Sequence, residues 1–276
     1  MKTKLVVLTL IGLVWHWEAY AFDGNTHKAL TSKAISESGL HDYLKDQLDI
    51  GQGLTTILLL DETITPDADR VLPQVPAYPL IAELLTAGAG LEDIPMPRAR
   101  HHFHDPNRDA GLDNNTEHPA RAPAINRFSK TVWGLSFDLT GASALDRALG
   151  TEGSQWETEY ENYFAWPDAR DYFYEALTDA NEAVREHYLA MTFVALGHVL
   201  HLLEDMGVPP HVRNDWIEAH FRVPVGSWSN PFESHVEKEG CSKKSVGEKL
   251  RNPSLGSGVS REAPSTPPPR HRPRFG

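Results

Sequence analysis

The sequence contains a single cysteine in 276 residues, so it has no internal disulfide framework. Basic residues are also few, with 26 Lys and Arg against 38 Asp and Glu and a formal net charge of −12. This balance argues against a protein that holds nucleic acid on a basic surface. No apolar run, including the one at residues 5–15, is long enough to span a bilayer. Histidine, in contrast, occurs 14 times.

The first 21 residues have the pattern of a secretory signal peptide. Lys2 and Lys4 precede the apolar run 5–15, and residues 19–21 (Ala-Tyr-Ala) match a small-x-small cleavage site. Cleavage there makes Phe22 the first residue of an exported protein, secreted or periplasmic. A signal anchor and a buried first helix are the alternatives.

Residues 242–276 differ in composition from the rest of the chain. They contain six prolines, eight Lys or Arg and two Glu, with little apolar periodicity, which is typical of a disordered tail. Residues 22–241 therefore form the one predicted domain, with 16 basic and 35 acidic residues and a net charge of −19. A surface this acidic repels polyanions unless bound cations reverse its sign locally.

Helical spacing dominates this domain, and the predicted fold class is all-α. Four helices are expected, at about residues 31–44, 79–89, 168–187 and 188–206. The last is apolar nearly all round, as in a central helix, and Pro209 and Pro210 end it. Segments 61–79 and 98–126 are rich in Pro, Asp and Asn, which predicts long surface loops.

The helix at 188–206 carries a pair of residues with metal-ligand spacing. His201 and Asp205 are four residues apart and share one helical face, and His211 follows just beyond the prolines. Burying an imidazole and a carboxylate is costly unless each has a partner. A divalent cation provides one, and this pair of ligands suits zinc. For one isolated pair, a buried His–Asp hydrogen bond is the simpler alternative.

Other imidazoles and carboxylates have a similar arrangement, and one ion would not use them all. The further candidates are Glu92 and Asp93, the run His101-His102-Phe103-His104, His27, and His235 with Glu239 at the same four-residue spacing.

Three of these motifs together resemble the zinc-dependent phospholipase C and single-strand-specific nuclease superfamily. They are HLLEDMGVPPH at residues 201–211, the later His-x3-acid pair His235 and Glu239, and HFHDP at 102–106, which resembles the phospholipase branch in particular. The resemblance covers about residues 22–239. It implies one multi-helix domain of the zinc-dependent phospholipase C type that holds three zinc ions.

The resemblance also implies the ligands of each ion. They are Asp93, His102, His201 and Asp205 for the first ion; His211, His235 and Glu239 for the second; and the amino and carbonyl groups of Phe22, with His27 and the bridging carboxylate of Asp205, for the third. Family members typically begin with tryptophan where this chain has Phe22. Asp93 is implied to orient or deprotonate the attacking water, and Glu92 is an alternative for Asp93.

The implied activity is that of a secreted phosphodiester hydrolase similar to phospholipase C. Such an enzyme cleaves a phospholipid to diacylglycerol and a phosphorylated alcohol during transient contact with a membrane surface. We expect a monomer without a stable nucleic-acid partner. The alternatives are a single-strand-specific zinc nuclease and a zinc-binding protein of the same fold without turnover.

The remaining histidines have less distinctive positions. His198 either orients a ligand or is a paired core residue, and His101 and His104 either support His102 or lie in a loop. His187 is expected at the surface.

Overall fold

The computed structural model of the chain describes residues 24–61, 63–64, 75–94, 96–112, 141–152, 162–214 and 235–236. Within these ranges the regular structure is helical, and pairing of extended segments is limited to the isolated bridges Ile57–Leu80 and Asp105–Ala110. The all-α prediction is confirmed to this extent. The predicted signal peptide, Phe22, Glu239 and the predicted tail lie outside the described residues.

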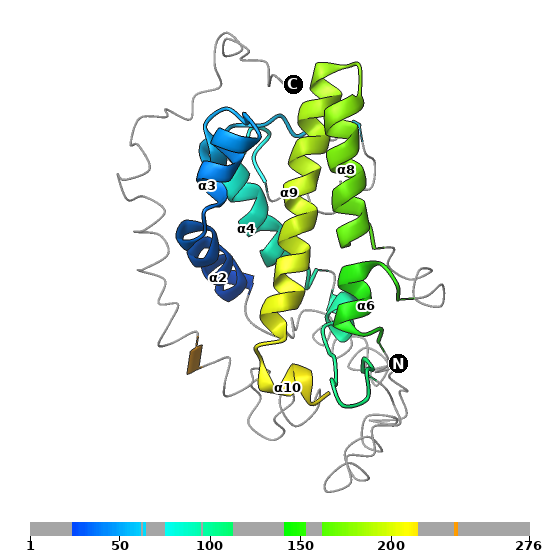
Figure 1. Cartoon of the computed structure of the whole chain (residues 1–276). Coiled ribbons are helices and arrows are strands. Elements are labelled where there is room, and N and C mark those ends of the chain that lie inside the picture. The colour runs from blue at the N-terminus through cyan, green and yellow to red at the C-terminus, as the bar shows by residue number, and fades with distance from the viewer. Residues whose placement is uncertain are drawn as a thin grey trace, which may run out of the picture.

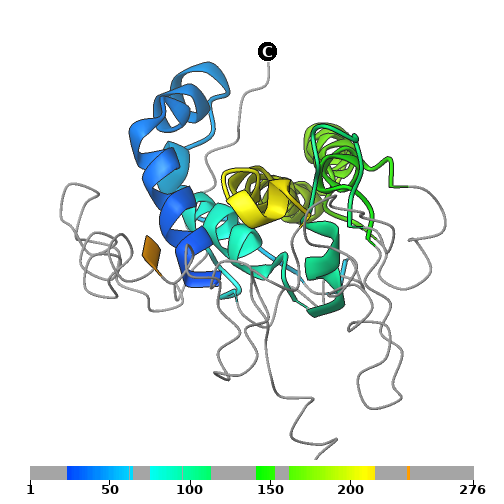
Figure 2. The ribbon, with the colours of Figure 1, turned by 90° about the horizontal axis from the view of Figure 1, so that it is seen from below.

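Four longer helices form the body of the fold. They are α2 (Gly24–Glu37), α4 (Ile81–Leu91), α8 (Trp166–Thr178) and α9 (Glu182–Asp205). The short elements are α3 (Leu40–Asp42), the π-helical turn η1 (Tyr43–Gln47), the 3-10 turns η2 (Gly53–Thr55) and η5 (Met96–His101), α6 (Ala144–Leu149) and α10 (Pro209–Val212). The helix α9 runs through the centre, with α8 on one side and α4 on the other (Figure 1). Seen from below, α2, α4, α9 and α8 follow one another in that order (Figure 2).

The central helix is longer than the apolar pattern indicates. It begins at Glu182 instead of residue 188, and α8 ends at Thr178. Asn181 causes this break, because its side-chain oxygen accepts a hydrogen bond from the Ala183 N–H at 3.1 Å and caps the first turn of α9. His187 therefore lies inside α9 and is fully buried, so the prediction of a surface position was wrong.

Glycines let α4 and α9 approach each other at backbone distance. A Cβ atom added to Gly88 would lie 2.2 Å from the Val194 carbonyl oxygen, and one added to Gly197 would lie 2.3 Å from the Leu85 carbonyl oxygen. Atoms do not approach this closely, so the crossing requires residues without a side chain. It brings the carboxyl-terminal half of α4 directly against the second half of α9.

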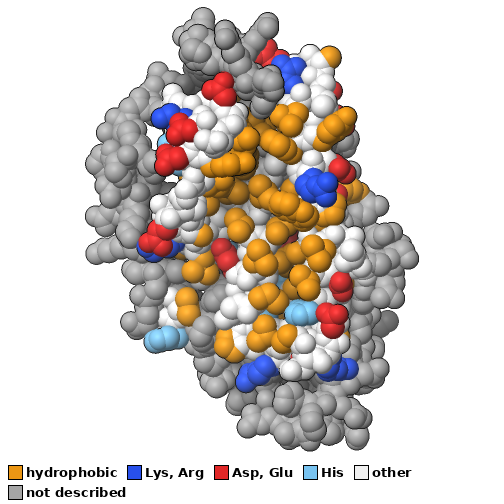
Figure 3. Space-filling view, in the orientation of Figure 1, with side chains coloured by type: hydrophobic (Ala, Val, Ile, Leu, Met, Phe, Trp, Pro, Cys, Tyr) orange, Lys and Arg blue, Asp and Glu red, His pale blue; other side chains and the backbone are white. Residues whose placement is uncertain are grey.

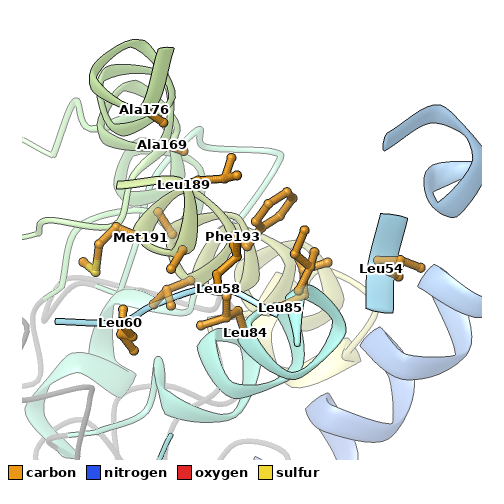
Figure 4. Packing of buried hydrophobic residues seen from close by; sticks show 14 of the residues in the cluster. Leu54, Leu58, Leu60, Leu84, Leu85, Ala169, Ala176, Leu189, Met191 and Phe193 are labelled. Carbon is orange, nitrogen blue, oxygen red and sulfur yellow. The ribbon is translucent and has the colours of Figure 1, made fainter. Parts of the chain in front are cut away.

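Apolar side chains fill the space between these helices. Leu84 and Leu85 of α4 pack with Phe193 of α9 and with Leu58 from the segment that precedes α4 (Figure 4). In the space-filling view, apolar side chains also gather over the middle of the described face, along α9 (Figure 3). Among the described residues, no helix combines the length and apolar character needed to cross a membrane.

The segment after α4 departs from the predicted surface loop over 98–126. Its described part, residues 98–112, begins in the turn η5 and buries Ala99, His101, His102 and Phe103. The Phe103 carbonyl accepts a hydrogen bond from the Ala144 N–H at 3.0 Å, which fixes the segment to α6. The Pro and Asp content correctly predicted an irregular backbone, but it did not predict that these side chains are buried.

Candidate metal centre

Six predicted ligand residues converge where the first turn of α2, the end of α4 and the last turns of α9 meet (Figure 1). His201 and Asp205 lie one turn apart on α9, and the other four come from the flanking segments. All six are at most 2% exposed: His27, Asp93, His102, His201, Asp205 and His211. The sequence motifs therefore identified residues that are distant in the chain and close in the fold.

Asp93, His102, His201 and Asp205 surround one point. The Nδ1 atom of His102 lies 3.3 Å from Asp93 Oδ1, 3.0 Å from Asp205 Oδ2 and 3.1 Å from His201 Nε2. His201 Nε2 lies 3.2 Å from Asp205 Oδ2 and 3.9 Å from Asp93 Oδ1. Ligand atoms about 2.0–2.1 Å from a tetrahedral zinc ion are about 3.4 Å apart. Five of the six pairwise separations among the four side chains are therefore those of a tetrahedral metal site, and Asp93, His102 and His201 could hold a metal ion.

Asp205 also faces a second group of ligand atoms. Its Oδ1 atom lies 3.5 Å from His27 Nε2, whereas its Oδ2 atom faces His102 and His201. The rings of His27 and His201 stack with centroids 3.6 Å apart. With its two oxygens directed at different imidazoles, Asp205 has the geometry of a bridging carboxylate.

Backbone carbonyls fix the orientation of two of the imidazoles. His201 Nδ1 lies 2.6 Å from the Ala89 carbonyl oxygen, and His211 Nδ1 lies 2.9 Å from the His102 carbonyl oxygen. A carbonyl only accepts hydrogen bonds, so Nδ1 carries the proton in both rings and Nε2 is the nitrogen that could coordinate a metal ion. Metal-binding histidines in proteins are commonly held in this way.

His201 cannot serve two ions at once. It is near His27 and Asp205 in one group and near Asp93 and His102 in the other, but its single coordinating nitrogen binds one ion. Asp93, His102, His201 and Asp205 are the candidate ligands of the first ion. His27 and Asp205 then remain as candidate ligands of a second ion.

The partners of the two buried carboxylates among the described residues are imidazoles. Within the described residues, the oxygens of Asp93 and Asp205 make no hydrogen bond of good geometry, although imidazole nitrogens lie nearby. Burial acts to raise the pKa of Asp205, but the imidazoles of His211 and His201 outweigh it and hold that pKa well below its ordinary value. Burying unsatisfied charge is costly, and a bound cation would remove the cost.

Protons bound to the imidazoles can partly balance the negative charge of the buried carboxylates in place of a metal cation. Burial acts to lower the pKa of His27, but Asp205 and Glu204 outweigh it and raise the pKa to about 9. A metal ion at this position would therefore displace protons from the imidazoles, as metal binding to histidine generally does.

Glu92 belongs to an ion-pair network that adjoins the cluster, with its Oε1 atom 3.8 Å from His102 Nε2. Its carboxylate accepts hydrogen bonds from Arg98 and from Arg147, the latter at 2.6 Å, and pairs with His198 Nδ1. Burial acts to raise the pKa of Glu92, but the two guanidinium groups outweigh it and hold the pKa well below its ordinary value. Since its oxygens are engaged in this way, the geometry favours Asp93 over Glu92 as the ligand.

The other upstream and core histidines have structural partners. His198 stacks on Phe164 with centroids 4.2 Å apart and pairs with Glu92, as expected of a paired core residue. His101 Nδ1 accepts a hydrogen bond from the Ala142 N–H at 2.9 Å, and His104 Nδ1 lies 2.9 Å from Ser143 Oγ. The latter two residues tie the segment after α4 to the start of α6.

The structure does not assemble the ligand set implied for the second ion. His211 is buried, with Nδ1 3.5 Å from Asp205 Oδ2. His235 is exposed, and the short segment 235–236 is drawn apart from α10 in both views (Figures 1 and 2). Glu239 and Phe22 lie outside the described residues.

Two residues of the centre were missed from the sequence. Glu204 Oε2 lies 2.7 Å from His27 Nδ1, and the Thr31 hydroxyl donates a hydrogen bond to Glu204 Oε1 at 2.8 Å. The signal for Glu204 was present, since it is an acidic residue one turn from His201 in an otherwise apolar stretch of α9.

Comparisons with protein-family models, with curated proteins and with solved structures found no match for the chain. The assignment of a metal centre therefore depends on the geometry of its own residues: a buried helical cluster of four imidazoles and two carboxylates that could hold metal ions.

Proposed function

We propose that the chain is an exported zinc-dependent phosphodiester hydrolase of the phospholipase C type. The observation that carries the proposal is the set of separations, 3.0–3.9 Å, among the ligand atoms of Asp93, His102, His201 and Asp205. Two imidazoles and two carboxylates suit zinc, which takes nitrogen and oxygen ligands in tetrahedral geometry. The motifs at residues 102–106 and 201–211 add the resemblance to the phospholipase branch.

The chemistry of phosphodiester hydrolysis fits this ligand set. Bound zinc lowers the pKa of a coordinated water from about 15.7 toward 7 and stabilises negative charge on phosphate oxygens. Asp205 would hold two ions close together, since its Oδ1 and Oδ2 atoms face different imidazoles. The resemblance implies that Asp93 would orient the attacking water or accept its proton, and neither of its oxygens has a hydrogen-bond partner among the described residues.

The charge of the chain supports a lipid substrate over a nucleic acid. Residues 22–241 carry a net charge of −19, which repels a polyanion over the length of a strand. A single phosphodiester on a zwitterionic lipid requires only local positive charge, and bound zinc ions would supply it. The signal-peptide pattern at residues 1–21 supports export.

One comparison of substrates tests the proposal. The full chain, loaded with zinc, is assayed on a chromogenic phosphocholine ester and on single-stranded DNA, with chelated protein and Asp93→Asn as controls. We expect zinc-dependent hydrolysis of the ester that Asp93→Asn abolishes. Hydrolysis of DNA alone would indicate a nuclease. Full zinc occupancy without turnover on either substrate would indicate a binding protein.

A further inference from the structure

The support of His27 differs in kind from that of the other imidazoles oriented through Nδ1. His201 and His211 are held by backbone carbonyls of Ala89 and His102. His27 is held by a side chain, the carboxylate of Glu204, at 2.7 Å. A carboxylate partner orients a ligating imidazole and also increases its basicity, which a carbonyl does more weakly.

Glu204 is itself held in place by the helix that carries His27. His27 and Thr31 are four residues apart on α2 and lie on one face of it. One oxygen of Glu204 contacts His27 Nδ1, and the other accepts the Thr31 hydroxyl at 2.8 Å. The Glu204 side chain is only 15% exposed. Both oxygens of Glu204 therefore contact side chains of α2, and Glu204 immediately precedes Asp205 in α9.

The consequence for His27 follows from proton placement. An ionised carboxylate only accepts, so His27 Nδ1 carries the proton and Nε2 presents its lone pair. Nε2 is the atom that lies 3.5 Å from Asp205 Oδ1. Without Glu204 the ring could adopt the other tautomer or rotate, and Nε2 would no longer be fixed as a ligand.

We propose that Glu204 is a positioning residue that fixes the tautomer and orientation of His27 for the ion shared with Asp205. This inference rests on the proposed metal binding. It assigns the contact between α9 and α2 a specific role: it fixes one ligand of the second ion and leaves the set Asp93, His102, His201 and Asp205 unaffected. Removing such an outer carboxylate typically costs 10–100-fold in metal affinity.

The test measures metal affinity ion by ion in the full-length chain. Zinc is titrated against a chromogenic chelator, and cobalt(II) absorption reports the coordination of each bound ion. The variants are Glu204→Gln, which removes the charge at nearly constant volume, and Glu204→Ala. Thr31→Val removes the hydroxyl that holds Glu204, and Thr31→Ser keeps it. Glu37→Gln is the matched control, because it makes the same acid-to-amide change at an exposed position of α2, the helix that carries His27.

The expected result is a 10–100-fold weaker affinity for one ion in both Glu204 variants, with a changed cobalt(II) spectrum for that ion alone. Thr31→Val should lose affinity for the same ion, and Thr31→Ser and Glu37→Gln should match the wild type. If Glu204→Ala fails to fold, the comparison of Thr31→Val with Thr31→Ser still measures the effect of Glu204 position on zinc affinity. Wild-type affinity for every ion in both Glu204→Ala and Thr31→Val, or equal weakening of all ions, overturns the positioning role alone. A wild-type chain that binds no zinc overturns the proposed function as well.

Discussion

Replacing Asp205 with asparagine should disrupt more of the metal centre than any other single change. Its Oδ2 atom lies 3.0 Å from His102 Nδ1 and 3.2 Å from His201 Nε2, and its Oδ1 atom lies 3.5 Å from His27 Nε2. The substitution keeps the volume but removes the charge and one of the two acceptor oxygens. We therefore expect Asp205→Asn to weaken the binding of two ions and to abolish hydrolysis.

The size of the effect can be estimated from ligand-linked stability. Zinc at 100 times its dissociation constant stabilises the folded state by about 2.7 kcal/mol per ion. Loss of a ligand costs at least the 10–100-fold in affinity that an outer-sphere partner costs. At a 100-fold loss the same zinc concentration stabilises by only about 0.4 kcal/mol. For a domain of this size, the difference is about 5–9 °C in Tm per ion.

Thermal unfolding with and without zinc, together with zinc per chain after dialysis, measures this effect. Asp171→Asn, at an exposed position of α8, is the matched control and should keep the full zinc-dependent rise in Tm. A variant that keeps full zinc occupancy, normal turnover and the wild-type rise in Tm would refute the role of Asp205. The cluster would then be a hydrogen-bonded His–Asp core without a metal.

Three further predictions address other parts of the molecule. A chain extended by methionine before Phe22, or left uncleaved, should bind one zinc fewer than the cleaved chain, and equal stoichiometry by metal analysis would remove Phe22 from the site. Arg147→Met leaves the buried Glu92 with one cation fewer, so the free energy of unfolding in urea should fall by about 3–5 kcal/mol; an unchanged value would contradict the ion-pair role. Burial lowers the pKa of His187 below its ordinary 6.5, and its Nδ1 accepts a hydrogen bond from the Asp61 N–H. As the pH falls below 6.5 the unfolded chain therefore takes up a proton first, and stability decreases. In His187→Gln the loss between pH 7.5 and 5.5 should be smaller, and an equal loss in both proteins would show that His187 does not contribute.

The candidate ligands on α9 and α10 could be recognised in the sequence because their spacing is a local property. His201, Asp205 and His211 are set by helix periodicity and by the prolines that begin α10. Periodicity also identified α4, within two residues at either end. It misplaced the start of α9, since the capping residue Asn181 outweighed an apolar pattern that changes only at residue 188.

What the sequence could not provide was the set of contacts made across the chain. Choosing Asp93 over Glu92 required knowing that Arg98 and Arg147 turn toward Glu92, and one of these lies 55 residues away. Glu204 likewise gained its role only through α2, which lies 177 residues away from it at His27. Local spacing cannot reveal which buried acid meets a cation and which meets an imidazole.

The contact between Gly88 and Gly197 determines how the metal centre forms. Because the two backbones touch there, the carbonyl of Ala89 reaches His201, and packing together with this hydrogen bond holds the end of α4 against α9. The candidate ligands on α9 and just after α4 are thus preorganised, and ion binding there should involve little loss of conformational entropy. We expect the metal-free and metal-bound proteins to share the same backbone in this region.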